Sequence, residues 1–542
     1  MAENQPRPNR LTAHLAGLSD LSLVAVAAMV LFALSAWPLL LVAMPPLQDL
    51  PNHVASAYII AHPELYPEYV FNGFLKSNSL LTLWLYLLGP YGLVGAARAF
   101  TAIVLAATAL ALPIFILRFA GRASLWVGLL FAWPLVHGFF LAMGMLNFSF
   151  AFALSLLLLV LLDRQRERPS LPRAIAIFVF ALLIWYAHPF PLMVVAGLVG
   201  LDCIRRPAWR ERMKAAYALL APLVPVALLS FASAQRQLVK ADPARAQGQA
   251  FFAYAPPWEI FAHLWLDVSG ALTRWGSVTI VPAALLLWFA WKQRRLSRSF
   301  FSPLGMAGMA LGYLALPAML SNWWYFNCRL VPFLWAGAIV RLPATVRRPI
   351  ALALAGSALW FSAVLGIDYL RLDRDRAAFA AGTAVVPERA TLLPLLFKHR
   401  KSSDFTASLT HAWAEYVLAK STSAPLVFAV ERSYPMTYRD FPPAALVPPA
   451  LDQFAEKRAT PAQVCRLFRP ERPQVDAQCI QEWHRQWSDF WRQAEPRFDY
   501  LLTWAMPAET RPMIPSTYHR IFAAPELQIY QRISPGTDVP GL

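Results

Sequence analysis

The chain has few charged residues and few cysteines for its length of 542 residues. Charged side chains make up 15% of it, and four residues are cysteine. It contains no glycine-rich phosphate loop and no cysteine cluster at zinc-binding spacing, which excludes the commonest nucleotide-binding and zinc-binding signatures. In contrast, 58% of the residues are hydrophobic and the mean hydropathy is +0.45. Repeated long apolar runs of this kind predict an α-helical polytopic membrane protein.

The excess of basic residues is best explained by the membrane. The formal net charge is +17, which in a soluble protein would suggest a nucleic-acid partner. Here the arginines stand in short loops between apolar runs, where they orient spans against anionic lipid. We therefore expect contacts with membrane lipids and no nucleic-acid partner.

About eleven apolar runs predict transmembrane spans. The first, Leu21–Met44, is too long for the core of a signal peptide and is interpreted as a retained span. The others are Phe100–Leu117, Leu125–Met143, Leu146–Leu162, Ala174–Ala187, Pro189–Leu201, Ala215–Ala232, Val278–Trp291, Leu304–Leu320, Leu330–Leu342 and Ile350–Ile367.

The orientation follows from one short segment and from the loop charges. Leu80–Val94 is apolar but broken by Gly89-Pro90, and at about 1.5 Å per residue it is too short for a bilayer core. It is therefore assigned to the interface, within a first outer loop spanning 45–99. This assignment places about 20 Lys and Arg residues on the cytoplasmic side with the N-terminus, against roughly seven outside.

An odd number of spans leaves the rest of the chain outside. We expect a transmembrane domain over 1–367 and a soluble α/β domain over 368–542, in the periplasm of a bacterial inner-membrane protein. In the second domain, Pro425–Val430 and Phe498–Thr503 predict strands, and His411–Lys420 and Gln481–Gln493 predict helices.

Two cysteines fall in this exterior region. Cys465 and Cys479 lie 14 residues apart, and an oxidising compartment would permit a disulfide between them. Cys203 is expected at a cytoplasmic helix end as a free thiol, and Cys328 at the outer face has no evident partner.

A short polar stretch, Gln48–His53, follows the first span and is the leading site candidate. In a partly dry pocket, the Asp49 carboxylate can accept the proton of a hydroxyl nucleophile. Gln48 and Asn52 are expected to bind substrate beside it. His53, one helical turn further, can orient Asp49, contact a phosphate or share a divalent metal with it. The alternatives are an Asp that caps a surface helix and a His satisfied at the interface.

A second polar cluster lies at the outer start of the tenth span. Arg329 begins an apolar helix, where a charge without a partner is costly, so an anionic lipid phosphate is its expected ligand. Trp323, Tyr325 and Asn327 precede it and suit a sugar or isoprenoid surface. The alternative is an aromatic belt with an arginine that extends to the interface.

Two isolated residues complete the predicted substrate site. His188 lies at the outer turn between two short spans, and Lys76 lies in the first outer loop. No acidic or basic residue stands near the middle of a predicted span, in contrast to ion-coupled transporters. The polar residues gather at the outer ends instead, which favours a site on the outer leaflet.

Taken together, the Asp after the first span, the basic-loop hairpins and the Asn327–Phe333 stretch resemble the GT-C superfamily. These are polytopic glycosyltransferases that use polyprenyl-phosphate sugars, with protein O-mannosyltransferases and aminoarabinose transferases among them. The resemblance implies a catalytic base at Asp49 and a donor-phosphate contact at Arg329. Many members carry an Asp-Glu pair in the first loop, whereas Asp49 precedes Leu50, with Glu64 and Glu68 the nearest other acids. The need for a divalent metal therefore stays open.

The implied reaction is an inverting transfer of a sugar from a polyprenyl-phosphate donor to a hydroxyl of a lipid, glycan or protein acceptor. The alternative functions are a flippase of lipid-linked glycans and a non-catalytic assembly subunit with the same scaffold.

Overall fold

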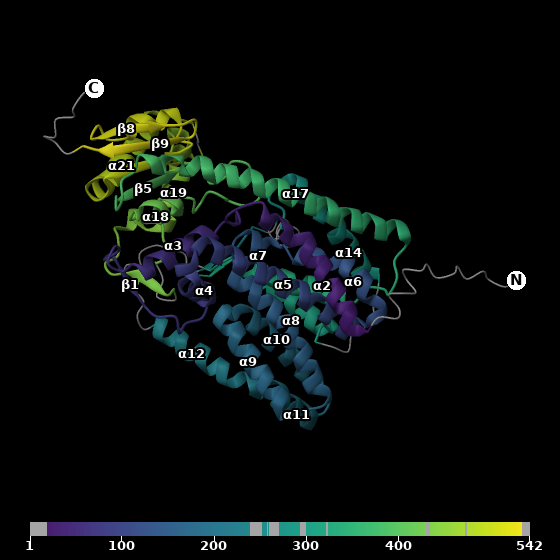
Figure 1. The fold of residues 1–542 in the computed structure, drawn as a ribbon. Helices are drawn as coiled ribbons and strands as arrows, with labels where there is room; N and C mark the ends of the chain where they lie inside the picture. Colours follow the sequence, from purple (N-terminus) through teal and green to yellow (C-terminus); the bar gives the residue numbers. More distant parts are fainter. Residues whose placement is uncertain are drawn as a thin grey trace.

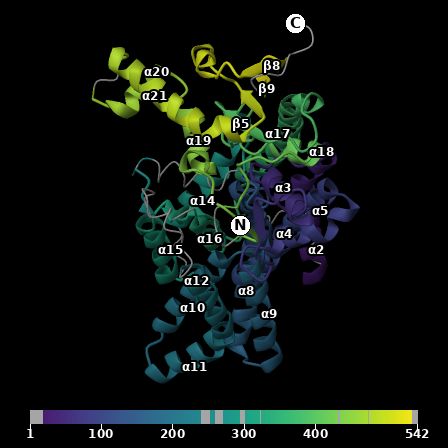
Figure 2. The same cartoon turned by 90° about the vertical axis from the view of Figure 1, so that its left-hand side faces the viewer.

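The computed structural model describes residues 19–238, 252–256, 258, 270–292, 300–320, 323–429, 434–471 and 474–533. Figures 1 and 2 show a bundle of apolar helices, from which the long helix α17 (Arg348–Ala380) runs to a smaller part that holds a four-stranded sheet. The remaining helices of the bundle are α2 (Asp20–Ala36), α5 (Leu93–Ala120), α6 (Leu125–Ala132), α7 (Phe139–Ala142), α8 (Leu146–Glu167), α9 (Leu171–Ala187), α10 (Pro189–Ile204), α11 (Trp209–Leu220), α12 (Val224–Leu238), α14 (Ile280–Lys292), α15 (Pro303–Ala315) and α16 (Val331–Ile339).

Within the described residues, six helical segments are long and apolar enough to cross a bilayer. They are Asp20–Leu40, Leu93–Ala120, Arg122–Ala142, Leu146–Glu167, Trp209–Ser233 and Arg348–Ala384. The predicted class of α-helical membrane protein agrees with this composition. The other five predicted spans correspond to shorter apolar helices (α9, α10, α14, α15 and α16), so the total of about eleven stays a prediction.

The first outer loop is largely ordered secondary structure. It contains α3 (Leu50–Ala61), the short strand β1 (Tyr69–Phe71) and α4 (Leu80–Leu88). The predicted interfacial segment forms α4, a helix of nine residues that packs against α3 and α5. This length is below what a bilayer core requires.

The C-terminal part contains a mixed sheet of strand order β5-β7-β9-β8. β5 (Leu392–Leu396) runs parallel to β7 (Tyr500–Trp504), and β9 (Leu527–Arg532) pairs antiparallel with both β7 and β8 (Tyr518–Ala523). β7 coincides with the predicted strand Phe498–Thr503. The described residues of Pro425–Val430 form turns and bends rather than a strand, so that prediction is wrong.

The helices of this part are α18 (Ala414–Lys420), α19 (Pro448–Lys457), α20 (Pro461–Phe468) and α21 (Ala477–Ala494). A disulfide joins Cys465 of α20 to Cys479 of α21, with their Cα atoms 5.3 Å apart. Cys203 and Cys328 are both buried free thiols.

The first outer loop is tied to the C-terminal part. β1 pairs antiparallel with β6 (Met436–Tyr438), with Tyr69 opposite Tyr438. Ala55 and Ile59 of α3 are buried in the hydrophobic core of the C-terminal part. In addition, α17 runs without a break across the predicted boundary at 367. The two parts are therefore packed together around α3.

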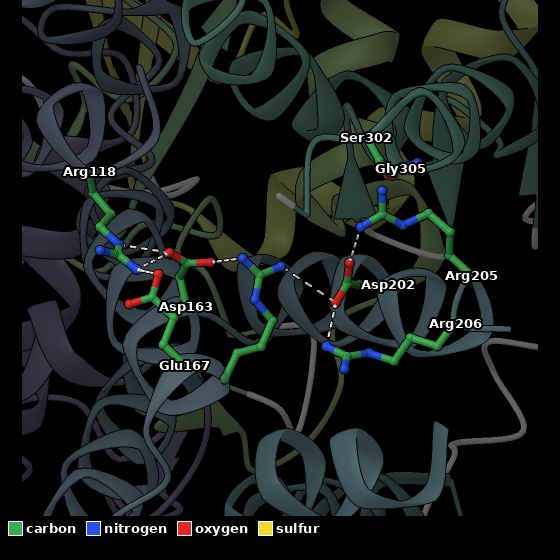
Figure 3. A network of polar contacts seen from close by, with 9 residues as sticks. Arg118, Asp163, Glu167, Asp202, Arg205, Arg206, Ser302 and Gly305 are labelled. Atoms are coloured by element: carbon green, nitrogen blue, oxygen red, sulfur yellow. Dashed lines mark hydrogen bonds and ion pairs between the residues drawn. The ribbon is translucent and has the colours of Figure 1, made fainter. Parts of the chain in front are cut away.

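A charged network holds helix ends together elsewhere in the bundle (Figure 3). Arg118 of α5 pairs with Asp163 and Glu167 of α8, at 2.5 Å in both cases. Asp202 of α10 is buried and pairs with Arg205 at 2.8 Å. These arginines belong to loops that the sequence assigns to the cytoplasm.

Candidate functional site

The backbone around Asp49 is fixed by the turn that follows α7. The Gln48 and Asp49 amides donate to the carbonyl oxygens of Ala142 (3.2 Å) and Met143 (3.1 Å). Gly144 has a φ of +81°, and a Cβ atom there would lie 2.6 Å from the Asp49 nitrogen. Pro51 sits in the first turn of α3, where it costs no hydrogen bond. The start of α3 is thus held against the bundle.

The Asp49 side chain does not serve as a helix cap. Asp49 occupies the N-cap position of α3, yet its carboxylate accepts no capping hydrogen bond. Its Oδ1 lies 3.4 Å from His411 Nε2 and 3.5 Å from Gln48 Nε2. The side chain is 16% exposed and lines a cavity. The capping alternative is therefore not what the structure shows.

Asn52 connects α3 to the C-terminal part. It is fully buried, and its Nδ2 donates to the Leu426 carbonyl at 3.0 Å and lies 3.1 Å from His411 Nδ1. Its Oδ1 accepts from the Phe428 amide at 3.0 Å. Asn52 lines neither of the cavities described below and acts through these partners.

His53 lines the smaller of the two cavities described below, and among the described residues its side chain makes no hydrogen bond to Asp49. Its ring contacts Phe428 edge-on, with ring centroids 5.4 Å apart. Burial lowers the pKa of His53 to about 4, although the nearby Asp49 charge acts in the opposite direction. His53 is therefore a neutral imidazole at pH 7. The histidine that meets the Asp49 carboxylate is His411.

Arg329 is a buried cation whose partners are all neutral. It is 5% exposed, its Nη1 lies 2.5 Å from His188 Nε2, and its Nη2 donates to the Trp324 carbonyl at 3.2 Å. The guanidinium also lies over the rings of Phe148 (5.4 Å) and Trp323 (5.6 Å). Among the described residues, no carboxylate pairs with it, and its Nε has no hydrogen-bond partner. A charge held this way favours an anionic ligand.

A cavity of about 150 Å³ joins Asp49 to Arg329. His53, His188 and Trp323 also line it. The cavity therefore brings together residues from both polar clusters predicted from the sequence, although Asp49 and Arg329 are 280 residues apart in the chain.

A second cavity, of about 910 Å³, adjoins it and opens between the bundle and the C-terminal part. Asp49, Trp324 and Tyr434 line both cavities. The larger one also has Gln48 and Tyr325 on one side and His411 on the other. Asp49 thus stands where the two spaces meet.

Three predicted substrate-binding residues lie outside both cavities: Asn52, described above, and Asn327 and Lys76. Asn327 is buried and donates from Nδ2 to the Tyr313 carbonyl at 3.1 Å, which fixes the start of α16. Lys76 donates to the Tyr434 carbonyl at 3.4 Å. Neither Asn327 nor Lys76 lines the described cavities, so neither is placed to contact a ligand bound in them.

Several site residues escape inspection of the sequence. His411, Phe428, Tyr434 and Asp452 come from the C-terminal part and line the larger cavity. Burial raises the pKa of Asp452 to about 7, and the neighbouring Glu456 adds to this while His411 opposes it. The only sequence signal for His411 is that histidine is uncommon in this chain, which contains ten among 542 residues. Its partner Asn52 is 359 residues away.

The described residues contain no preformed set of metal ligands. No group of three or more His, Cys, Asp or Glu side chains among them is placed to hold a metal ion. Asp49 and His53, the pair predicted for a metal, lack a third such ligand in the part of the chain that is described. The residues present therefore do not fit a tightly held divalent ion.

No protein-family model matches the chain, and no curated protein matches it. The geometry of the two adjoining cavities is therefore the basis for inferring the function.

Proposed function

We propose that the protein is an inverting membrane glycosyltransferase that takes a sugar from a polyprenyl-phosphate donor. The observation that carries this proposal is the cavity lined by both Asp49 and Arg329, whose guanidinium has only neutral hydrogen-bond partners among the described residues. Those two groups are what the reaction requires: a base for the nucleophile and a positive charge for the leaving phosphate.

The donor phosphate would bind at Arg329. The guanidinium has no acidic partner among the described residues, and His188, Trp323 and Phe148 surround it. A phosphate there would supply the missing negative charge through charge-assisted hydrogen bonds. The flat faces of the aromatic rings suit the sugar or the first isoprene unit.

The acceptor would enter through the larger cavity. Asp49 borders both spaces, so a hydroxyl in the larger cavity can reach the carboxylate while the sugar occupies the smaller one. Asp49 removes the hydroxyl proton, the oxygen forms a bond to the anomeric carbon, and the bond from that carbon to the phosphate oxygen breaks. The polyprenyl phosphate leaves as an anion stabilised by Arg329. A single displacement inverts the anomeric configuration.

The test is sugar transfer by purified protein in lipid vesicles. Undecaprenyl-phosphate monosaccharides with a labelled sugar are the donors, and a membrane-lipid extract supplies acceptors. Asp49→Asn should lower transfer by roughly 10²- to 10⁴-fold, because the amide cannot take the proton, while binding of undecaprenyl phosphate is kept. Glu64→Gln is the matched control, since Glu64 is an exposed first-loop acid outside both cavities.

Each other outcome points to a different function. Full activity of Asp49→Asn would remove the catalytic assignment. Movement of the donor lipid across the vesicle without loss of its sugar would indicate a flippase. Neither transfer nor movement, with copurification of an active transferase, would indicate an assembly subunit.

A further inference from the structure

Among the described residues, His411 is the only basic side chain of the C-terminal part with a nitrogen within 4.0 Å of an Asp49 carboxylate oxygen, at 3.4 Å. We infer that His411 is a positioning residue for the Asp49 carboxylate, and that Asn52 sets the tautomer in which it does so. The inference rests on the proposed function for its kinetic part, whereas its structural part stands on the hydrogen bonds of Asn52 and on the 3.4 Å contact between His411 Nε2 and Asp49 Oδ1.

The orientation of the Asn52 amide is fixed by two backbone groups. The Phe428 N–H is a donor, so the Asn52 atom 3.0 Å away must be the oxygen. The Leu426 carbonyl is an acceptor, so the Asn52 atom 3.0 Å away must be the nitrogen. The amide therefore cannot be flipped without losing both bonds.

The amide orientation fixes the imidazole. Asn52 Nδ2 has two hydrogens, of which one goes to Leu426 and the other points to His411 Nδ1 at 3.1 Å. His411 Nδ1 must then be the acceptor, and its proton resides on Nε2. Nε2 faces Asp49 Oδ1 at 3.4 Å. His411 thus offers Asp49 a neutral N–H donor and is not set up to take its proton.

This arrangement orients the carboxylate for its proposed task. Oδ1 faces His411 Nε2 at 3.4 Å and Gln48 Nε2 at 3.5 Å, so Oδ2 is the oxygen left for an acceptor hydroxyl. A neutral N–H group orients a carboxylate without giving it a proton, which suits a general base. A base whose rotamer is locked by a partner is placed more reproducibly than one that turns freely.

The segment that carries His411 is anchored to the membrane part. The Ala407 amide donates to Gln48 Oε1 at 2.8 Å, and the Asp404 amide donates to the Leu272 carbonyl at 2.9 Å. Closer to the ring, the Leu409 amide donates to the His399 carbonyl at 3.0 Å. His411 is therefore delivered to Asp49 by the docked C-terminal part, and the site is complete only when that part is in place.

The first experiment observes the tautomer directly. The full-length protein is labelled with ¹⁵N-histidine, reconstituted in phosphatidylethanolamine and phosphatidylglycerol vesicles at pH 7, and studied by solid-state NMR. The signal lost in His411→Gln identifies the residue. We expect an unprotonated Nδ1 and a protonated Nε2, and we expect Asn52→Leu to abolish this single state. A protonated Nδ1 in the wild type would overturn the inference.

The second experiment separates positioning from folding. With the labelled donors described above, His411→Ala should lower kcat by roughly tenfold to a hundredfold at unchanged donor KM, as is usual for residues that orient a reacting group. His411→Gln, which keeps an N–H near Asp49, should recover part of kcat. His62→Gln is the control, since His62 bonds to the Tyr58 carbonyl and lines neither cavity. Wild-type kcat in His411→Ala would also overturn the inference.

The two proposals fail in different ways. If the wild type transfers no sugar, the proposed function fails while NMR still decides whether His411 donates to Asp49. In that case Asp49→Leu must shift the Nε2 signal of His411, and an unshifted signal would end the inference. The titratable groups near His411 are Asp49, His53, His399 and Asp452, so all NMR spectra are compared at one pH.

Discussion

At the scale of single residues, Arg329 is the clearest sign that the cavity takes an anion. Desolvating a guanidinium without an acidic partner costs free energy that neutral partners do not fully offset. His188, the Trp324 carbonyl and two aromatic rings lower this cost, but none of these direct contacts carries a negative charge. A purely structural arginine would be expected to have a carboxylate beside it. We therefore predict that this position gives up stability in exchange for anion binding.

This leads to a prediction in which affinity and stability change in opposite directions. Arg329→Leu should weaken binding of undecaprenyl phosphate by roughly tenfold to a hundredfold, the loss expected for hydrogen bonds to a charged group. Its Tm in detergent should equal or exceed that of the wild type, because the uncompensated charge is gone. Arg329→Lys, the control, keeps the charge but loses the paired N–H groups, and should fall between the two in affinity.

A lower Tm for Arg329→Leu together with unchanged lipid binding would show that the arginine is structural. Affinity is measured with the sugar-free lipid phosphate, so the result does not depend on the identity of the donor sugar.

At the scale of elements, the sequence predicts the apolar helices, because the hydrophobicity and the length of each run determine them. Each predicted span is helical over most of its length, because a run of apolar residues in lipid satisfies its backbone within a helix, although Leu304–Leu320 ends in the short strand Met319–Leu320. The Asp49 and Arg329 clusters could likewise be chosen from the cost of polar groups beside apolar runs. Such reasoning works residue by residue along the chain.

Contacts between distant segments were not predictable in this way. Pro425–Val430 has the composition of a strand. However, the Leu426 carbonyl and the Phe428 amide form hydrogen bonds with the Asn52 side chain, so these two groups do not pair with a neighbouring strand. The pairing of β1 with β6, and the contact of His411 with Asp49, join segments more than 350 residues apart. No local pattern encodes partners at that separation.

The turn after α7 is a local element on which the site depends. Gly144→Ala should cost about 1–2 kcal/mol from its positive φ alone, and the new Cβ would also press on the backbone of Asp49. We expect a lower Tm and a larger loss of kcat than of donor affinity, because the start of α3 is displaced relative to Arg329. The measurements are thermal unfolding and the transfer assay described above.

Gly200→Ala provides the comparison. Gly200 lies within α10, and an added Cβ there meets nothing within 4 Å. Alanine in a helix interior is favoured over glycine by roughly 0.5–1 kcal/mol, so this variant should be at least as stable as the wild type. Equal behaviour of the two variants would contradict the role given to the turn.

At the scale of the whole molecule, charge and shape give the same orientation. α11, which follows the charged end of α10, lies far from β8 and β9 in both views (Figures 1 and 2). Asp163 and Asp202 neutralise arginines from α5, α8 and α10 at this end (Figure 3). Basic loops concentrate on the cytoplasmic side of membrane proteins. We therefore predict that the Asp49 cavity and the C-terminal part lie on the opposite side.

Labelling of introduced cysteines tests this orientation. His519→Cys lies on the exposed surface of β8 and Arg210→Cys lies exposed in α11. In intact bacterial cells, a membrane-impermeant maleimide should label position 519 at once and position 210 only after the membrane is permeabilised. The wild type is the background control, since Cys203 and Cys328 are buried and Cys465 is bonded to Cys479. The reverse pattern would place the Asp49 cavity on the cytoplasmic side. Asp49 would then be exposed to cytoplasmic nucleotide sugars, and this result would contradict the proposed lipid-phosphate donor.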